Sequence, residues 1–335
     1  MISFAPMEGI GTCYYRRVHH RLFPEGIDRF YTPFLSVYPN LAFRKRDLRE
    51  IRPAAGECPE DTKIRRMLVP QILARNAKEI LWAAQQLSAL GFSMIDLNMG
   101  CPSGTVVGKG GGAGMLSDPG RLDRMLGEVF SDPDFAASGV TLSVKTRLGL
   151  SDPEEFFTIL PVLSKYPLRE IIVHPRVRAE QYSGHPHREL LRRILWSTQI
   201  PVGYSGDLFT AEDVHRFRDE FPEIPHILLG RGIVSDPSLA RQCSGGAPLS
   251  VNELKSFVQA VTTEYEAVLD NERQLLLKLK ELWYYMGALF VSRDGSDTER
   301  LLRNLRGAAS MSEYRNALYA LFEKCTLGGH FSGIA

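Results

Sequence analysis

The stretch Met94-Ile95-Asp96-Leu97-Asn98-Met99-Gly100-Cys101-Pro102-Ser103 joins an apolar run to a short polar turn. Its first four residues have the composition of a buried strand. The loop that follows, Gly108-Lys109-Gly110-Gly111-Gly112-Ala113-Gly114, is too rich in glycine for regular secondary structure. A cysteine at the carboxyl end of a strand, beside a loop that lets a ligand approach closely, is placed for chemistry. The alternative is a buried structural cysteine.

Seven other apolar runs predict strands, and amphipathic helical stretches lie between most of them. The strands are Ile2–Ala5, Arg29–Thr32, Leu68–Ile72, Thr141–Thr146, Glu170–His174, Pro201–Tyr204 and His226–Leu229, with Met94–Asn98 as the eighth. The helices include Ala77–Leu90, Arg121–Phe130, Pro153–Lys165, His187–Trp196 and Ala211–Phe221. Eight strands alternating with helices predict an α/β protein with a (β/α)8 TIM barrel. A doubly wound open sheet is the alternative, but no GxGxxG follows the first strand.

The pattern changes after Gly245-Gly246-Ala247-Pro248. Leucines then recur at helical spacing, and no convincing strand is visible up to about Leu321. We therefore predict a catalytic barrel domain over residues 1–244. A smaller all-helical domain of three or four helices is predicted over 249–327.

Composition bounds the class of protein. The 335 residues are 44% hydrophobic and 24% charged, with a net charge of +1, so any nucleic-acid binding must use a local basic patch. The five cysteines, at 13, 58, 101, 243 and 325, form no CxxC pair, so no metal site is expected and a reducing cytoplasm is favoured. Neither a signal peptide nor a membrane span is expected.

Polar and reactive side chains fall at the predicted strand ends, where barrel enzymes carry their active sites. Each has a simpler interpretation: His174 as a core histidine, Lys145 as a solvated lysine, Gln71 as a capping residue. A functional site is favoured because all of these residues fall at predicted strand ends. The set comprises Pro6 and Met7, Gln71, Asn98 and Cys101, Lys145 and Arg147, His174 and Arg176, Ser205-Gly206-Asp207, and Gly230-Arg231.

Two of these segments suit a phosphate group. Loops after the seventh and eighth strands of a barrel often bind phosphate through backbone N–H groups. Ser205-Gly206 and Gly230-Arg231-Gly232 meet that need, and the arginine adds a charge-assisted partner. Lys145 and Gln71 could bond the polar edge of a ring system, where a cation stabilises an anionic reduced flavin.

Taken in order, these segments resemble the tRNA-dihydrouridine synthases, bacterial members in particular. The likeness covers the whole barrel and extends into the helical region, and its Asn-x-Gly-Cys-Pro block is highly specific. The matching segments are Ala5-Pro6-Met7-Glu8-Gly9, Asp96–Ser103, Lys109–Gly114, Val144–Gly149, Val173–Arg176 and Gly230-Arg231-Gly232.

The resemblance implies an FMN-dependent enzyme, fed by NADPH, that reduces the C5=C6 bond of a uridine in tRNA. Cys101 would be the proton donor, and Asn98, Arg147 and Arg176 would face the substrate. The residues implied to hold FMN are Pro6, Met7, Gln71, Lys145, His174, Ser205, Gly206, Asp207, Gly230 and Arg231. Family members usually have Asn where this chain has Ser205, so we expect altered FMN contacts there rather than loss of FMN.

Two other functions are weighed against this one. The first is an FMN-dependent barrel reductase of a small molecule, of the dihydroorotate or enoate type, which would give the helical region no task. The second is a non-catalytic tRNA-binding protein on the same fold. We expect a monomer in which the helical domain over residues 249–327 binds tRNA through its basic side chains, with the basic Arg44–Arg52 segment of the barrel as the alternative. The candidates are Arg44-Lys45-Arg46, Arg49, Arg52, Arg65-Arg66, Lys278, Lys280, Arg293, Arg300, Arg303 and Arg306.

Overall fold

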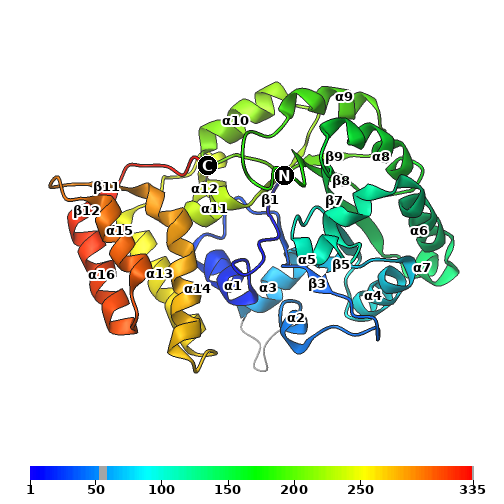
Figure 1. Ribbon diagram of the computed structural model, residues 1–335. Coiled ribbons are helices and arrows are strands. Elements are labelled where there is room, and N and C mark those ends of the chain that lie inside the picture. The colour runs from blue at the N-terminus through cyan, green and yellow to red at the C-terminus, as the bar shows by residue number, and fades with distance from the viewer. Residues whose placement is uncertain (53–58, 334–335) are drawn as a thin grey trace.

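Parallel strands and surrounding helices form one large α/β body in this computed structural model, which describes residues 1–52 and 59–333 (Figure 1). All eight predicted strands are present. They are β1 (Ile2–Phe4), β2 (Arg29–Tyr31), β4 with β5 (Leu68–Val69 and Gln71–Leu73), β6 (Met94–Met99), β7 (Thr141–Gly149), β8 (Ile171–Val177), β9 (Val202–Tyr204) and β10 (His226–Leu229). The two-residue strand β3 (Leu35–Ser36), which pairs with β5, was not predicted.

The barrel closes at Pro70. β2 pairs with β4 and β6 pairs with β5, while β1 joins β2 to β10, so the ring is complete. Proline cannot donate a ladder hydrogen bond, which suits it to the point where a strand changes neighbours. Its carbonyl still accepts from the backbone N–H of Asp96 at 2.9 Å. Val69, just before it, accepts from Thr32 on the other side at 3.1 Å.

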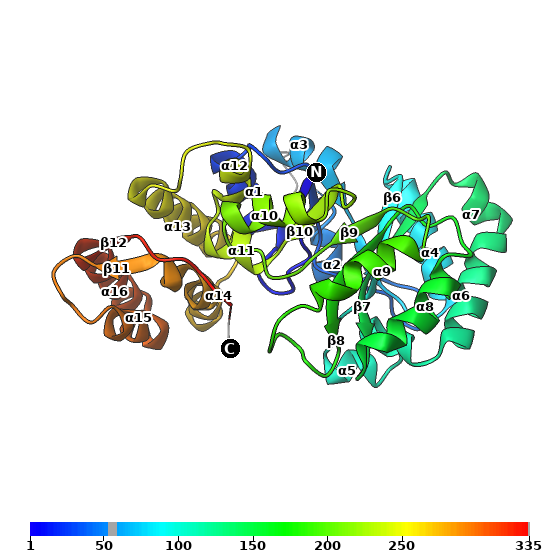
Figure 2. The same cartoon turned by 90° about the horizontal axis from the view of Figure 1, so that it is seen from above.

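Helices cover the outside of the ring, as Figure 2 shows from above. Sequence signals mark several of their starts: Asn76 caps one helix, and Thr210 with Asp213 forms a capping box on another. The helices are α1 (Cys13–Leu22), α2 (Lys45–Arg49), α3 (Pro59–Met67), α4 (Ala77–Ala89), α5 (Gly104–Val107), α6 (Pro119–Ser131), α7 (Pro133–Ala137), α8 (Phe156–Leu163), α9 (Leu191–Trp196), α10 (Ala211–Glu220), α11 (Arg231–Ser235) and α12 (Leu239–Cys243), with short 3-10 turns η1 (Gly112–Ser117), η2 (Pro153–Glu155) and η3 (Arg188–Leu190).

The C-terminal region is largely helical, as predicted, and lies to one side of the barrel (Figure 1). Its helices are α13 (Val251–Glu266), α14 (Glu272–Met286), α15 (Thr298–Gly307) and α16 (Met311–Lys324), with the 3-10 turn η4 (Gly287–Leu289). It also contains an unpredicted antiparallel pair, β11 (Phe290–Ser292) and β12 (Cys325–Leu327). Trp283 anchors its core and donates to the Tyr314 hydroxyl at 2.9 Å.

Polar contacts join the helical region to the first βα loop of the barrel. The Lys278 ammonium donates to the Gly9 carbonyl at 2.8 Å, and the Thr12 and Tyr265 hydroxyls are 2.8 Å apart. The helical region therefore borders the carboxyl ends of the strands, where the predicted site lies.

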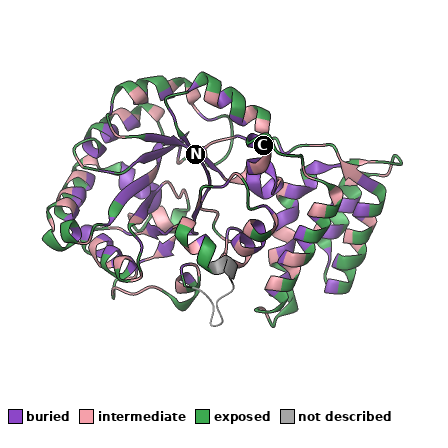
Figure 3. Ribbon diagram, turned by 180° about the vertical axis from the view of Figure 1, so that it is seen from behind, coloured by how far each residue is buried: buried purple, intermediate pink, exposed green. Residues whose placement is uncertain are grey.

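Burial follows the barrel architecture (Figure 3). Strand residues are buried on both faces, as expected for a parallel sheet covered by helices. Polar side chains are buried inside the barrel, and His226 is hydrogen-bonded there to Ser3 and Glu170, each at 2.8 Å. No helix in the described ranges is both long enough and apolar enough to cross a membrane.

Candidate active site

A continuous hydrogen-bonded chain runs from β7 to Cys101. The Asp96 carboxylate accepts from the Ser143 hydroxyl and from the Gln71 amide, each at 2.7 Å. This fixes the Gln71 amide, whose oxygen accepts from the Asn98 amide at 2.8 Å. The Asn98 oxygen in turn accepts from the Cys101 backbone N–H at 2.9 Å. All four side chains before Cys101 are buried, so this chain orients the cysteine loop.

Two ionisable groups of the strand layer have displaced pKa values. Burial raises the pKa of Asp96 to about 6, against the lowering effect of its bonds from Gln71 and Ser143. Burial also lowers the pKa of Lys145 to about 8, and the charge of Arg147 adds to this effect. Lys145 therefore remains mostly protonated at neutral pH, which supplies a cation at the carboxyl end of β7.

The Cys101 loop is held by backbone contacts. Arg147, which is 1% exposed, donates to the Gly100 carbonyl at 2.9 Å, and the Ala113 N–H donates to the Cys101 carbonyl at 3.1 Å. Gly112 has φ +54°, and a Cβ there would lie 2.8 Å from the Cys101 oxygen, so the close turn requires glycine. Burial raises the pKa of the Cys101 thiol, although a hydrogen bond from the Ser103 backbone acts to lower it. The thiol therefore keeps its proton at neutral pH.

Arg176, which is buried, pairs with Asp207, which is partly exposed. The guanidinium donates to both carboxylate oxygens, at 2.6 and 3.0 Å, and to the Ser183 and Gly184 carbonyls. The pair draws the loop after β8 against the loop after β9. Burial alone would raise the pKa of Asp207, but the Arg176 hydrogen bond and the Arg231 charge hold it below its ordinary value.

His174 is neutral in this setting. Burial, together with the charges of Arg147 and Lys145, lowers its pKa well below the ordinary value. Its Nε2 lies 3.1 Å from Nη1 of Arg176, and because arginine only donates, Nε2 accepts. The proton of the neutral ring therefore sits on Nδ1, which leaves that atom a hydrogen-bond donor.

Arg231 is held with one donor unused. Its Nη2 donates to Asp207, and its guanidinium carbon lies 4.9 Å from the Tyr182 ring centre and 5.4 Å from that of Phe209. Its Nη1 is buried with no hydrogen-bond partner among residues 1–52 and 59–333. A buried guanidinium N–H without a partner is suited to bind an anionic oxygen.

Two glycines of the neighbouring loops allow side chains of the protein to pack closely against the backbone. A Cβ at Gly206 would lie 2.1 Å from the Tyr204 hydroxyl, and one at Gly230 would lie 3.2 Å from the Met7 sulfur. The backbone N–H of Ser205 bonds the Val173 carbonyl at 2.9 Å.

A cavity of about 560 Å³ opens beside this cluster, between the barrel and α14. Pro6, Met7 and Glu8 line it from the loop after β1, Tyr182 from the β8 loop, and Arg231 from α11. Its wall is completed by residues 179–181, Ser183, Ile10, Glu281 and Tyr285.

Residues 3–301 match the family model described as dihydrouridine synthase. The chain belongs to the dihydrouridine synthase family. It is 31% identical over 284 residues to the tRNA-dihydrouridine(16) synthase of Pseudomonas putida, covering 80% of this chain and 82% of that protein. It is 32% identical over 247 residues to the protein of the same name from Aquipseudomonas alcaligenes, covering 72% and 74%.

Two further comparisons cover more of the chain or bear on its fold. Probable tRNA-dihydrouridine synthase 1 of Synechocystis is 25% identical over 319 residues, covering 92% of this chain and 80% of that protein. The structure of morphinone reductase in complex with tetrahydroNAD superposes with a TM-score of 0.51 and 9% identity, covering 74% of this chain and 87% of that one. That likeness supports the barrel fold of this dihydrouridine synthase family member.

Sequence reasoning missed most of the residues that line the cavity in this family member, among them Tyr182, Glu8 and Tyr285. Tyr182, whose ring also lies 5.4 Å from the Arg147 guanidinium, belongs to a loop without periodicity. Glu8 lies in the Ala5–Gly9 segment that carries the resemblance, but it was not predicted as a site residue. Burial raises the pKa of its carboxyl group, although the charge of Arg46 acts in the opposite direction. Tyr285 comes from α14, and only the tertiary fold brings it here.

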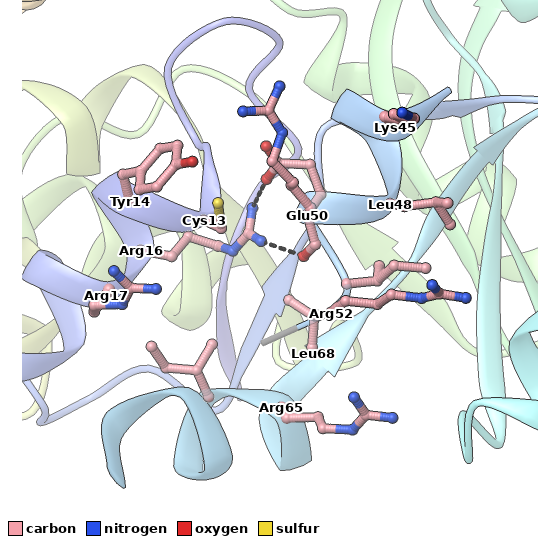
Figure 4. Close-up of a pocket in the computed structure, with 13 residues that line it drawn as sticks. Cys13, Tyr14, Arg16, Arg17, Lys45, Leu48, Glu50, Arg52, Arg65 and Leu68 are labelled. Atoms are coloured by element: carbon pink, nitrogen blue, oxygen red, sulfur yellow. Dashed lines mark hydrogen bonds and ion pairs between the residues drawn. The ribbon is translucent and has the colours of Figure 1, made fainter. Parts of the chain in front are cut away.

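A second cavity, of about 340 Å³, lies on the barrel flank between α1, α2 and α3 (Figure 4). One wall holds Arg16, whose guanidinium bonds both the Glu50 carboxylate, at 3.0 Å, and the Glu50 carbonyl. Glu50 is the one acidic side chain among the described lining residues. The cationic lining residues are Arg16, Arg17, Lys45, Arg49, Arg52 and Arg65.

Proposed function

We propose that this chain reduces the C5=C6 bond of the uridine at position 16 of tRNA, with FMN bound in the barrel and NADPH as the electron donor. The match to the dihydrouridine synthase family is the main support for this reaction. The names of two relatives, at 32% and 31% identity, support position 16. The hydrogen-bonded chain that ends on Cys101 supports catalysis by this copy of the fold.

The residues at the barrel mouth suit FMN. The partnerless Nη1 of Arg231 would meet the phosphate, and Gly206 and Gly230 lie in the two adjoining loops. Asp207 would orient Arg231 rather than touch the phosphate, because both are anionic. Ser205 would contribute near the phosphate, where a hydroxyl replaces the usual amide.

The flavin ring would lie over the strand layer. Lys145 would give its polar edge a positive charge, and Gln71 would offer an amide already oriented by Asp96. His174 would donate from Nδ1, and Pro6 with Met7 would line the cavity wall beside the ring.

FMN, when bound and reduced, supplies hydride chemistry to the substrate pyrimidine. Cys101 provides the proton that C5 needs once C6 has been reduced, and its raised pKa keeps that proton available at neutral pH. Asn98 and Arg147 hold the cysteine loop through its backbone, and Arg176 holds the loop that carries Tyr182. The uracil must leave its stack to reach the thiol.

Two surfaces are candidates for tRNA phosphates. On α15, Arg303 lies 3.8 Å from Asp297 and Arg306 lies 2.5 Å from Glu299, so two of its arginines already face an acid. The flank cavity instead gathers cations around the single acid Glu50, which is paired with Arg16. We propose that the flank takes the larger share of phosphate contacts.

The decisive experiment maps dihydrouridine in tRNA from a strain lacking this gene. The modification should disappear at position 16, return with the wild-type gene, and fail to return with Cys101→Ala. Dihydrouridine at other positions serves as the internal control. Unchanged tRNA would favour a small-molecule reductase, and rescue by Cys101→Ala would favour a non-catalytic tRNA-binding role.

A further inference from the structure

The segment after β12 returns from the helical region to the barrel. In Figure 1 it is the red segment that ends beside the barrel, near α12. The backbone N–H groups of Gly328 and Gly329 both donate to the Leu289 carbonyl at 3.0 Å, so the segment is tied down where it leaves. A Cβ at Gly329 would lie 2.3 Å from the Ala288 oxygen, so this close crossing requires glycine.

Phe331 is the anchor of this segment. It is 3% exposed, although Ser332 beside it is exposed. Its ring packs edge-on against Phe209, with centres 5.1 Å apart and planes at 81°, and lies 5.7 Å from the Tyr285 ring. An aromatic pair of this geometry contributes beyond simple burial and fixes the position of both rings.

Phe209 forms one side of the enclosure around Arg231. Its ring centre is 5.4 Å from the guanidinium, with Tyr182 on the same guanidinium at 4.9 Å and Asp207 bonding Nη2. These contacts leave Nη1 as the buried donor without a partner in the described chain. The direction in which Nη1 points therefore depends on where Phe209 lies.

We propose that Phe331 is a positioning residue for the cofactor phosphate: through Phe209 it holds Arg231 in the orientation that presents Nη1 to the FMN phosphate. This inference rests on the proposed FMN site. It also makes the segment after β12 a mechanical link between the helical region and that site, since the same segment is fixed to Leu289 at its other end.

The test is a double-mutant cycle on FMN affinity, measured by quenching of flavin fluorescence on titration with FMN-free protein. Phe331→Ala should raise the FMN Kd about three- to tenfold, the effect of removing one well-packed aromatic ring. Arg231→Met keeps the aliphatic packing against both rings but removes the phosphate donor. Adding Phe331→Ala to Arg231→Met should then change the Kd little.

Two controls separate this role from general stability. Ser332→Ala, on the exposed neighbour, should leave the Kd unchanged, and Phe331→Leu, which restores apolar packing, should recover most of the affinity even if Phe331→Ala folds poorly. An equal loss of affinity from Phe331→Ala with and without Arg231, or no loss at all, would overturn the proposal. Wild-type protein that binds no FMN would overturn the proposed function instead.

Discussion

The chemistry of a single thiol separates a proton donor from a structural cysteine. Cys101 is half-buried, its loop is held from three sides, and its raised pKa keeps it protonated. Cys101→Ala should retain FMN and its reduction by NADPH but slow dihydrouridine formation about 10²-fold or more, the usual scale for general acid catalysis. Single-turnover reduction of unmodified tRNA measures this. Cys101→Ser should fall close to the alanine variant, because an alcohol is a much weaker acid, and near-normal rates for both variants would contradict the assignment.

Lys145 gives a second residue-scale prediction. In the folded protein, burial lowers its pKa to about 8, whereas the ordinary value is 10.5. Between these values the unfolded chain binds more protons, so the contribution of Lys145 to the free energy of unfolding rises with pH. In FMN-free protein, Lys145→Met should therefore raise Tm by several degrees at pH 7, with the gain shrinking by about pH 10.

Calorimetry from neutral pH to about pH 10 checks this window. Lys165→Met is the matched control, because that lysine is 56% exposed, and its Tm difference from wild type should show no comparable narrowing with pH. If Lys145→Met raised Tm by the same amount at every pH, the Lys145 ammonium would not be desolvated in the folded protein.

At the scale of elements, Asp96 ties three adjacent strands together. It lies on β6 and accepts from Gln71 on β5 and Ser143 on β7. Asp96→Leu would leave the Gln71 amide donor unpaired in the barrel interior, while the Ser143 hydroxyl could still turn to the Ile95 carbonyl, 3.4 Å away. The free energy of unfolding should therefore fall by about 1–3 kcal/mol, the cost of one buried unpaired donor. Asp96→Asn should retain most of the stability, because its oxygen can still accept from Gln71 while the Ser143 hydroxyl turns to accept.

Urea denaturation measures the free energies of unfolding. The rate at which iodoacetamide labels Cys101 measures how well the cysteine loop is ordered. Asp96→Leu should label faster than wild type at equal pH, and Asp96→Asn should label like wild type. Equal labelling in all three proteins would show that the hydrogen-bonded chain does not order the cysteine loop.

Elements with enough periodicity were predictable from the sequence. The eight barrel strands are confirmed, since each is an apolar run between turn residues. The strands β3, β11 and β12 were missed, because they have two or three residues and, unlike the equally short β1, β2 and β9, stand outside the alternation of barrel strands with helices. The predicted ends of β7 and β8 were short: both strands continue to Gly149 and Val177, which places Arg147 and Arg176 within them.

The candidate site was also predictable only in part. Strand ends predict which residues converge, because parallel strands share one carboxyl edge. They do not predict partners: the Arg176–Asp207 pair and the Gln71–Asp96 bond depend on side-chain directions across the ring. Cys58 lies outside the described residues. The division at residues 244 and 249, the roles of the site residues and the monomeric state stay predictions.

At the scale of the whole molecule, the distribution of charge predicts how tRNA is held. Lys45, Arg49 and Arg52 line the flank cavity, and no acidic partner is present for them among the described residues. Changing these three to alanine should lower the slope of log K against log salt by about 0.7–0.9 for each phosphate that the variant no longer neutralises.

The matched comparison is the triple change Arg300→Ala, Arg303→Ala, Arg306→Ala on α15. It should lower the slope less, because two of those arginines are already paired with acids. Filter binding at several salt concentrations gives both slopes, and FMN content should be unchanged in each variant. A larger drop for the α15 variant would place the phosphate contacts on the helical region.

The closure of the ring between β1 and β10 has a consequence for biosynthesis. Ser3 pairs with Leu228, so the first strand made by the ribosome waits for a partner that is encoded near the end of the barrel. At about 5–20 residues per second, that wait is roughly ten to fifty seconds. Throughout it, the nascent chain carries an unpaired, largely apolar edge, which is the kind of surface that chaperones at the ribosomal exit bind and that aggregates when they are scarce.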